Sequence, residues 1–240
     1  MQNGKFEGDY GLGLMHSDAY DSNPQLQAMP CGEGMCALEW IYFASESGQY
    51  NGKSLRAWRE ASGQVLARLS PASADLVIPI PASGLPAGQG FARASNLPIQ
   101  RAIEKKVHGR SFIQSNQADR EGAVRSKFHF HRETIKNKRV VLVDDSLVRG
   151  TTLHHICQQV KGLGAKEVHV RIASPQVVEA CTKGIALPTR EELVCSWRSV
   201  DEVQAFLGVD SLAFLPEAFL KDRAEVACRS CFVRKSETQG

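Results

Sequence analysis

One stretch in the second half of the chain constrains its fold more than any other. Residues 140–143 are an unbroken apolar run of strand length, and residues 168–172 form a second one. Between them, apolar residues recur at spacings of three and four over residues 152–163, which predicts a helix that ends at Gly164. A strand, a helix and a strand at this spacing form a βαβ unit, whose strands run parallel in one sheet. We therefore expect an α/β fold with a mainly parallel sheet flanked by helices.

The sequence before this unit predicts further elements of the same fold. Residues 53–69 carry apolar side chains at helical spacing, residues 76–81 suit a buried strand, and residues 86–94 suit a helix of small residues. The apolar run 38–44 predicts a buried strand or turn that anchors a loose arm. The domain organisation that we expect is an arm over residues 1–35, a folded domain over 36–232 and a tail over 233–240.

Composition excludes few classes of protein but indicates the compartment. With 42% hydrophobic and 23% charged residues, the chain has the composition of an ordinary globular protein. The net charge of +3 is too small to indicate binding to nucleic acid or membrane. No run approaches the ~20 apolar residues of a membrane span, and the N-terminus has no signal-peptide pattern, so we expect a cytoplasmic protein. Seven cysteines then indicate metal ligands, catalytic thiols or core residues rather than disulfides.

Two adjacent carboxylates and a phosphate-type loop follow the strand at residues 140–143. Asp144 and Asp145 stand where the strand leaves the sheet, the usual place for ligand groups in an open α/β sheet. The loop from Ser146 to Thr152 contains Gly150 and leads into a helix, whose free amides suit a phosphate. Carboxylates suit ribose hydroxyls or Mg²⁺. The alternative is that these residues only cap a turn and a helix, but four such features in thirteen residues favour a sugar-phosphate site.

The segment Val-Val-Leu-Val-Asp-Asp-Ser-Leu-Val-Arg-Gly-Thr-Thr at 140–152 resembles the signature of type I phosphoribosyltransferases, which bind phosphoribosyl pyrophosphate (PRPP). Ser after the acids and Val-Arg before Gly are similar to one family, the amidophosphoribosyltransferases. Five further stretches carry the same resemblance, which covers about residues 36–232: 38–44, 77–81, 109–114, 165–171 and 188–193. It implies a type I phosphoribosyltransferase fold with a flexible loop over the site. It also implies amination of the anomeric carbon of PRPP by ammonia, which gives phosphoribosylamine and pyrophosphate in purine biosynthesis.

The resemblance also implies roles for individual residues. The expected catalytic residues are Asp144, Asp145 and Arg110, and the expected Mg²⁺ ligands are Ser83, Asp144 and Asp145. The expected substrate-binding residues are Ser146, Arg149, Gly150, Thr151, Thr152, Ser83 and Gly84. The basic stretch 101–132 corresponds to the family's flexible loop, which would close over PRPP and exclude water. Its alternative, a solvated or nucleic-acid-binding face, is less favoured beside a PRPP loop.

The cysteines indicate a metal centre. The pair Cys228 and Cys231 has the spacing of two thiolates that bind one centre. Cys36 and Cys181 stand at the ligand positions of the family's iron–sulfur subgroup, so the resemblance implies a structural [4Fe–4S] cluster, with Zn²⁺ as the alternative. Buried core positions are expected for the other cysteines considered: Cys157, Cys31 and Cys195.

Departures from the family limit what the resemblance implies. Its glutaminase domain has no counterpart in the about 35 residues before the match, and position 2 is Gln2 instead of the cysteine nucleophile. We therefore expect a fragment, a separate glutaminase subunit, or the use of ammonia itself. Ala82 replaces a common acid, while Glu104 and Val107 replace a Lys and a Tyr of the flexible loop. A phosphoribosyltransferase that uses a nucleobase and a non-catalytic PRPP sensor remain alternatives, and a homo-oligomer is expected.

Overall fold

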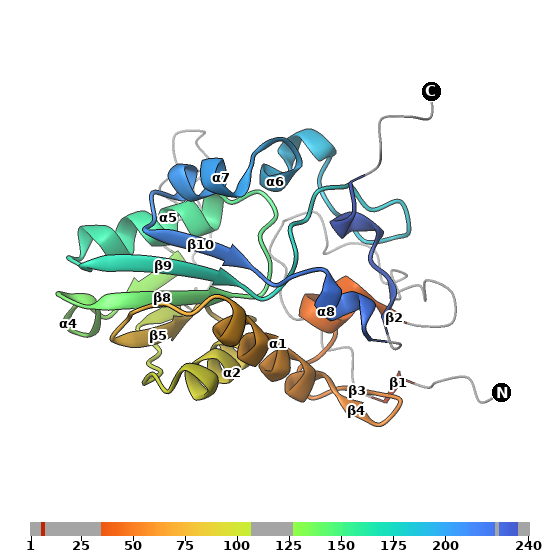
Figure 1. Cartoon of the computed structure of the whole chain (residues 1–240), viewed down its shortest axis with the longest axis horizontal. Coiled ribbons are helices and arrows are strands. Elements are labelled where there is room, and N and C mark those ends of the chain that lie inside the picture. The colour runs from red at the N-terminus through yellow and green to blue at the C-terminus, as the bar shows by residue number, and fades with distance from the viewer. Residues whose placement is uncertain (1–5, 8–34, 107–126, 224–225, 235–240) are drawn as a thin grey trace, which may run out of the picture.

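A four-stranded parallel sheet forms the centre of the computed structural model, which describes residues 6–7, 35–106, 127–223 and 226–234 (Figure 1). The strand order is β10-β9-β8-β5, and each neighbouring pair is parallel. The bounds are β5 Leu76–Pro79, β8 Arg139–Asp144, β9 Glu167–Ile172 and β10 Ser211–Phe214. The prediction of a parallel α/β sheet is confirmed.

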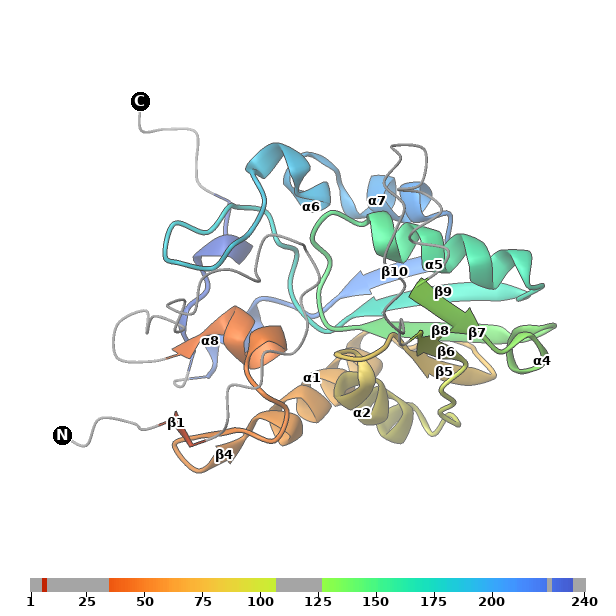
Figure 2. The ribbon, with the colours of Figure 1, turned by 180° about the vertical axis from the view of Figure 1, so that it is seen from behind.

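Helices cover the two faces of this sheet. Helices α1 (Leu55–Leu69) and α2 (Leu85–Ser95) lie on one side, while α5 (Thr151–Gly162) and α7 (Val200–Leu207) lie on the other (Figures 1 and 2). Because side chains alternate along a strand, β8 contributes to two cores. Its residue 141 packs in the α1–α2 core and residue 142 in the α5 core. The remaining short helices are α4 Arg132–Ile135, α6 Val194–Trp197 and α8 Ala218–Lys221.

Helices α1 and α2 approach each other closely because glycine faces the other helix on both. A Cβ atom on Gly63 would lie 2.9 Å from the backbone N of Phe91, and one on Gly90 would lie 3.0 Å from the Cα of Glu60. No side chain fits there. The close contact fixes α2, and thereby the loop 81–84 that precedes it, against the end of β8.

Short elements beyond the carboxyl ends of the strands join distant parts of the chain. Strand β2 (Met35–Cys36) pairs in parallel with β11 (Val226–Cys228), so the beginning and end of the described fold meet (Figure 1). The π-helix η1 (Glu39–Phe43) follows β2. The other small elements are β1 Phe6–Glu7, β3 Gln49–Tyr50, β4 Lys53–Ser54, η2 Arg190–Glu192 and η3 Ser230–Phe232.

The structure adds detail to two sequence predictions. The apolar run 38–44, predicted as a buried strand or turn, forms a single π-helical turn, because its backbone bonds locally and the amide of Ala44 donates to the carbonyl of Glu39. The basic stretch 101–132 contains an antiparallel hairpin of β6 (Ile103–Lys105) and β7 (Phe128–Phe130), which its weak periodicity did not reveal. Among the described residues, no helix has the length and apolar character that crossing a membrane requires.

Candidate active site

The acidic pair lies at the carboxyl edge of the sheet. Asp144 ends β8, and Asp145, next in the chain, is buried with 5% of its surface exposed. The hydroxyl of Ser146 donates to Asp145 Oδ1 at 2.5 Å, and the hydroxyl of Ser83 also hydrogen-bonds to this carboxylate. Gly84 packs against the same corner, since an added Cβ would lie 2.5 Å from the carbonyl oxygen of Val143. The structure thus brings the predicted Ser83–Gly84 loop to the acidic pair.

The electrostatics of this corner favour a bound cation. Burial, and then the charge of Asp145, raises the pKa of Asp144 well above its ordinary value. Burial also raises the pKa of Asp145, although hydrogen bonds from Ser146 and Ser83 and the charge of Arg59 oppose that rise. Two carboxylates with too little neighbouring positive charge are relieved by a divalent cation, and hard oxygen donors are the ligands that Mg²⁺ prefers. The donor set therefore fits the predicted Mg²⁺ site.

Arg59 and Tyr42 lie beside Asp144 and Asp145, and the sequence analysis did not identify them as site residues. Arg59 is buried in α1 and donates to the carbonyls of Trp40 at 2.8 Å and Ala44 at 2.8 Å, which fixes the π-helical turn. Burial, and then the charges of Asp145 and Asp144, raises the pKa of Tyr42 to about 12. The sequence contained one signal: Arg59 follows Leu55 by four residues and so stands on the buried side of an amphipathic helix.

The predicted phosphate loop ends at the N-terminus of α5. Gly150 precedes the helix with φ of +79°, a left-handed conformation that favours glycine, and an added Cβ would lie 3.2 Å from Cε1 of Phe206. Thr151 and Thr152 are exposed in the first turn, and no side chain caps the helix at Gly150. Free amides, two hydroxyls and the positive end of the helix dipole make this turn suitable for a phosphate group.

Comparison with known proteins agrees with this geometry. Residues 48–175, more than half of the chain, match the family described as phosphoribosyl transferase domain. The chain belongs to this family. The chloroplastic amidophosphoribosyltransferase of Vigna aconitifolia is 41% identical over 209 residues, 85% of this chain and 43% of that protein. The amidophosphoribosyltransferase of Archaeoglobus fulgidus is 45% identical over 182 residues, 75% of this chain and 40% of that protein.

A solved structure shares the fold of this phosphoribosyltransferase. The glutamine PRPP amidotransferase of B. subtilis, solved in complex with ADP and GMP, superposes with a TM-score of 0.76 at 39% identity. The match covers 86% of this chain and 47% of that one. The chain thus spans less than half the length of these three amidophosphoribosyltransferases.

Part of the expected flexible loop can be located. Residues 101–106 and 127–132 form the base of a hairpin, in which the amide of Lys106 donates to the carbonyl of Lys127 at 2.8 Å. Glu104 Oε1 lies 3.3 Å from His131 Nε2 within this base. The catalytic candidate Arg110 and the departure Val107 lie outside the described residues. Ala82 is exposed in the loop next to Ser83.

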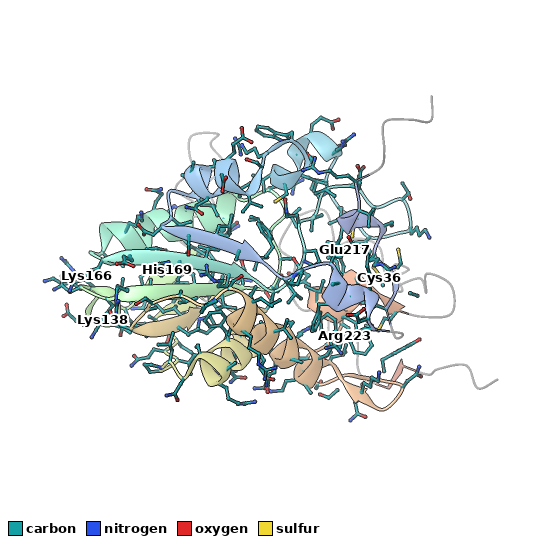
Figure 3. All side chains as sticks on the ribbon, viewed as in Figure 1. Cys36, Lys138, Lys166, His169, Glu217 and Arg223 are labelled. Atoms are coloured by element: carbon teal, nitrogen blue, oxygen red, sulfur yellow. The ribbon has the colours of Figure 1, made fainter. Side chains whose placement is uncertain are left out.

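Four of the predicted cysteines converge beyond the sheet, and we call them the four-cysteine cluster: Cys36, Cys181, Cys228 and Cys231. Cys36 and Cys228 are register partners in the β2–β11 pair. The carbonyl of Cys231 accepts hydrogen bonds from the amides of residues 178 and 179, three and two residues before Cys181. Burial, and then the neighbouring three thiols, raises the pKa of Cys231. Cys36 lies on the same side of the molecule as Glu217 and Arg223 (Figure 3).

The remaining cysteines belong to other parts of the structure. Cys157 and Cys195 are fully buried in the core on the α5 side, as predicted, and Cys31 lies outside the described residues. Within the described ranges, no group of three or more His, Cys, Asp or Glu side chains has the geometry to hold a metal ion. The structure brings the four predicted ligand cysteines into one region beyond the sheet.

Proposed function

We propose that this phosphoribosyltransferase aminates the anomeric carbon of PRPP to give phosphoribosylamine and pyrophosphate, the entry reaction of purine biosynthesis. The observation that carries the proposal is the position of the acidic pair and the uncapped turn at Gly150 on one edge of the sheet. The two groups suit the two ends of one sugar phosphate. The amidophosphoribosyltransferases among its relatives, 41% and 45% identical, specify the reaction.

Each end of the site would hold one part of PRPP. Arg149, Gly150, Thr151, Thr152 and Ser146 form the proposed cradle for the 5′-phosphate and ribose. Asp144 and Asp145 would hold the ribose hydroxyls and, with Ser83, Mg²⁺. Gly84 adjoins this corner, where the pyrophosphate would lie, and the resemblance gives Arg110 of the flexible loop a catalytic role there.

The chemistry requires positioning and fixed charge more than a strong nucleophile. The bond between the anomeric carbon and pyrophosphate breaks while ammonia donates its electron pair to that carbon, and the new ammonium group then loses a proton to solvent. Carboxylates near the ribose stabilise the oxocarbenium-like sugar, since charges fixed in advance need no reorganisation. Bound Mg²⁺ would supply charge that neutralises the leaving pyrophosphate. The stretch 101–132 would close over the site and keep water from the carbon.

Ammonia is the proposed nitrogen source, either free or released by a separate glutaminase subunit, and a homo-oligomer is the proposed assembly. Two other functions stay as alternatives. A nucleobase could replace ammonia as the nucleophile. The motive for a non-catalytic PRPP sensor is three departures from the family pattern: Ala82, Glu104 and Val107.

One experiment separates these functions. The purified protein is incubated with PRPP and Mg²⁺ together with ammonium, glutamine or each nucleobase, and pyrophosphate release is measured in parallel with trapped phosphoribosylamine. We expect turnover with ammonium and little with glutamine alone. Turnover only with a nucleobase would replace the proposed reaction, and PRPP binding without any turnover would indicate the sensor.

We further propose that the four-cysteine cluster holds a structural [4Fe–4S] cluster. Support comes from four thiols that reach one place from three separate segments: the β2 strand, the loop after β9 and the C-terminal turn. The resemblance to the iron–sulfur subgroup of the family favours the [4Fe–4S] cluster, and Zn²⁺, which four thiolates also hold, is the alternative. The bound cluster would connect the two ends of the domain, and the proposed reaction contains no redox step.

A further inference from the structure

The outer side of the phosphate loop is held by a segment more than forty residues away in the sequence. The amide of Val194 donates to the carbonyl of Val148 at 2.9 Å, and Arg149 Nε donates to Glu192 Oε1 at 3.1 Å. Gly150 packs against Val194, whose Cγ1 would lie 3.5 Å from an added Cβ. Three consecutive loop residues therefore adjoin the segment 189–194, and Figure 2 shows α6, which begins at Val194, beside the start of α5.

Glu192 is fixed at both carboxylate oxygens. While Oε1 accepts from Arg149, Oε2 accepts from the backbone amide of Thr189 at 3.2 Å, and the Thr189 side chain in turn accepts from the amide of residue 192. This capping box fixes the short helix η2 and with it the direction of the carboxylate. The hydrogen bond from Arg149, the largest cause, lowers the pKa of Glu192, so the side chain is ionised at neutral pH. Arg149 consequently meets a preoriented anion.

We propose that Glu192 is a positioning residue for the sugar 5′-phosphate, acting through Arg149. The ion pair holds the Arg149 side chain on the outer side of the loop, so that the loop keeps the conformation in which the amides after Gly150 face the phosphate. Both side chains of the pair are about half exposed, so the pair contributes little to folding stability. Its effect is on ligand binding. The inference rests on the proposed function, because it takes PRPP as the ligand.

Glu192→Gln removes the charge and leaves the amide of Thr189 facing a weaker partner. We expect the dissociation constants of PRPP–Mg²⁺ and of ribose 5-phosphate, measured by calorimetry, to rise about fivefold, the upper range for a half-exposed ion pair. Because the phosphate is bound alike in substrate and transition state, KM should rise while kcat changes less than about twofold. Urea unfolding should be unaltered.

The neighbouring residue provides a matched control. Glu191 is exposed and carries the same charge; its side chain hydrogen-bonds to Thr189, while Arg149 pairs with Glu192. Glu191→Gln should therefore leave both dissociation constants and KM as in the wild type. The double variant Glu192→Gln with Arg149→Gln tests the connection. If Glu192 acts through Arg149, the double variant should bind ribose 5-phosphate no more weakly than Arg149→Gln alone.

Three results would overturn the inference: unchanged affinity in Glu192→Gln, an equal loss in Glu191→Gln, or full additivity in the double variant. The proposed reaction can fail separately. A wild type that binds ribose 5-phosphate but makes no phosphoribosylamine would refute the amination, while the binding series still decides the role of Glu192. A wild type that binds neither PRPP nor ribose 5-phosphate would overturn both.

Discussion

Replacing Gly90 by alanine should destabilise this protein although alanine is the better helix former. An added Cβ would lie 2.7 Å from the carbonyl carbon of Glu60 in α1, where ordinary contacts begin at 3.4 Å. The obstacle is backbone, which cannot rotate away as a side chain can. Gly63→Ala meets the same obstacle from the other helix, with the carbonyl carbon of Ala87 at 2.7 Å. Either substitution forces α1 and α2 apart.

The magnitude follows from what the two helices cover. Moving them apart opens the core around Leu55, Leu66 and Phe91, which are fully buried. Overpacking of this kind costs about 1–3 kcal/mol, and contact between backbones belongs at the upper end. The better helix propensity of alanine returns about 1 kcal/mol. We therefore expect a net loss of about 2 kcal/mol in the free energy of unfolding, or roughly 4–8 °C in Tm for a domain of this size.

Urea unfolding followed by circular dichroism measures this loss, and Gly162→Ala is the matched control. Gly162 ends α5, and no heavy atom lies within 4 Å of a Cβ added there, so only helix propensity acts and stability should stay equal or rise. Because α2 follows the loop at Ser83, Gly90→Ala should also weaken PRPP binding. If Gly90→Ala were as stable as Gly162→Ala, the claim that the backbones of α1 and α2 are too close to admit a Cβ atom at residue 90 would be refuted.

Four more predictions concern the site and the cysteines. Asp144→Asn and Asp145→Asn should each lower turnover at least about a hundredfold while the fold persists, and near-normal activity would refute the acid assignment. Burial raises the pKa of Asp144, so at pH values above the ordinary pKa of aspartate the folded state is destabilised relative to the unfolded state. Asp144→Asn should therefore unfold at a higher urea concentration than the wild type near neutral pH. This gain in stability should shrink as the pH falls. PRPP–Mg²⁺ should slow hydrogen exchange in residues 101–132, and equal exchange would refute the lid. Anaerobically purified protein should be brown and contain iron. Ser substitution at any member of the four-cysteine cluster should abolish the colour, whereas Cys157→Ser should not. Zinc in stoichiometric amount would show a zinc site instead of the iron–sulfur cluster, and a stable protein without metal would refute both metal sites.

The parallel sheet could be predicted because its elements carry local signals. The strand that ends at Asp144 is a continuous apolar run, and the helix after Gly150 has apolar residues at helical spacing, so a short stretch of sequence predicts both. The strands and helix of a βαβ unit then pack in one favoured, right-handed arrangement. Strand β10 could not be predicted in the same way. It has four residues, lies at the sheet edge and buries only Leu212 well, so it has neither a long apolar run nor clear alternation.

Local sequence pattern predicted the site only where its residues follow one another; Ser83 and Gly84, far from the acids in the sequence, were placed in it by the resemblance to the family. Asp144 to Thr152 form a local motif, whereas Arg59 reaches the acids because α1 packs beside the π-helical turn. The partner of Arg149 is a further case, since Glu192 is 43 residues away. Such pairs depend on tertiary packing, so the spacing of residues in the sequence does not predict them. Residues 188–193 resemble the family, which marked the segment as part of it. The ion pair between Glu192 and Arg149 now gives a physical reason why this segment affects the phosphate loop.

The cysteines show how far spacing alone can lead. The pair at 228 and 231 is visible as a motif, but its partners are not adjacent to it: Cys181 lies 47 residues earlier, and Cys36 is separated from it by most of the chain. Pairing of β2 with β11 places Cys36 opposite Cys228, and the amides of residues 178 and 179 bind the carbonyl of Cys231. Because each strand has only two or three residues, hydrogen bonds alone would hold the ends of the domain weakly. A centre bound by all four thiolates would supply the missing connection, and its removal should therefore loosen β2 and β11 before it affects the parallel sheet.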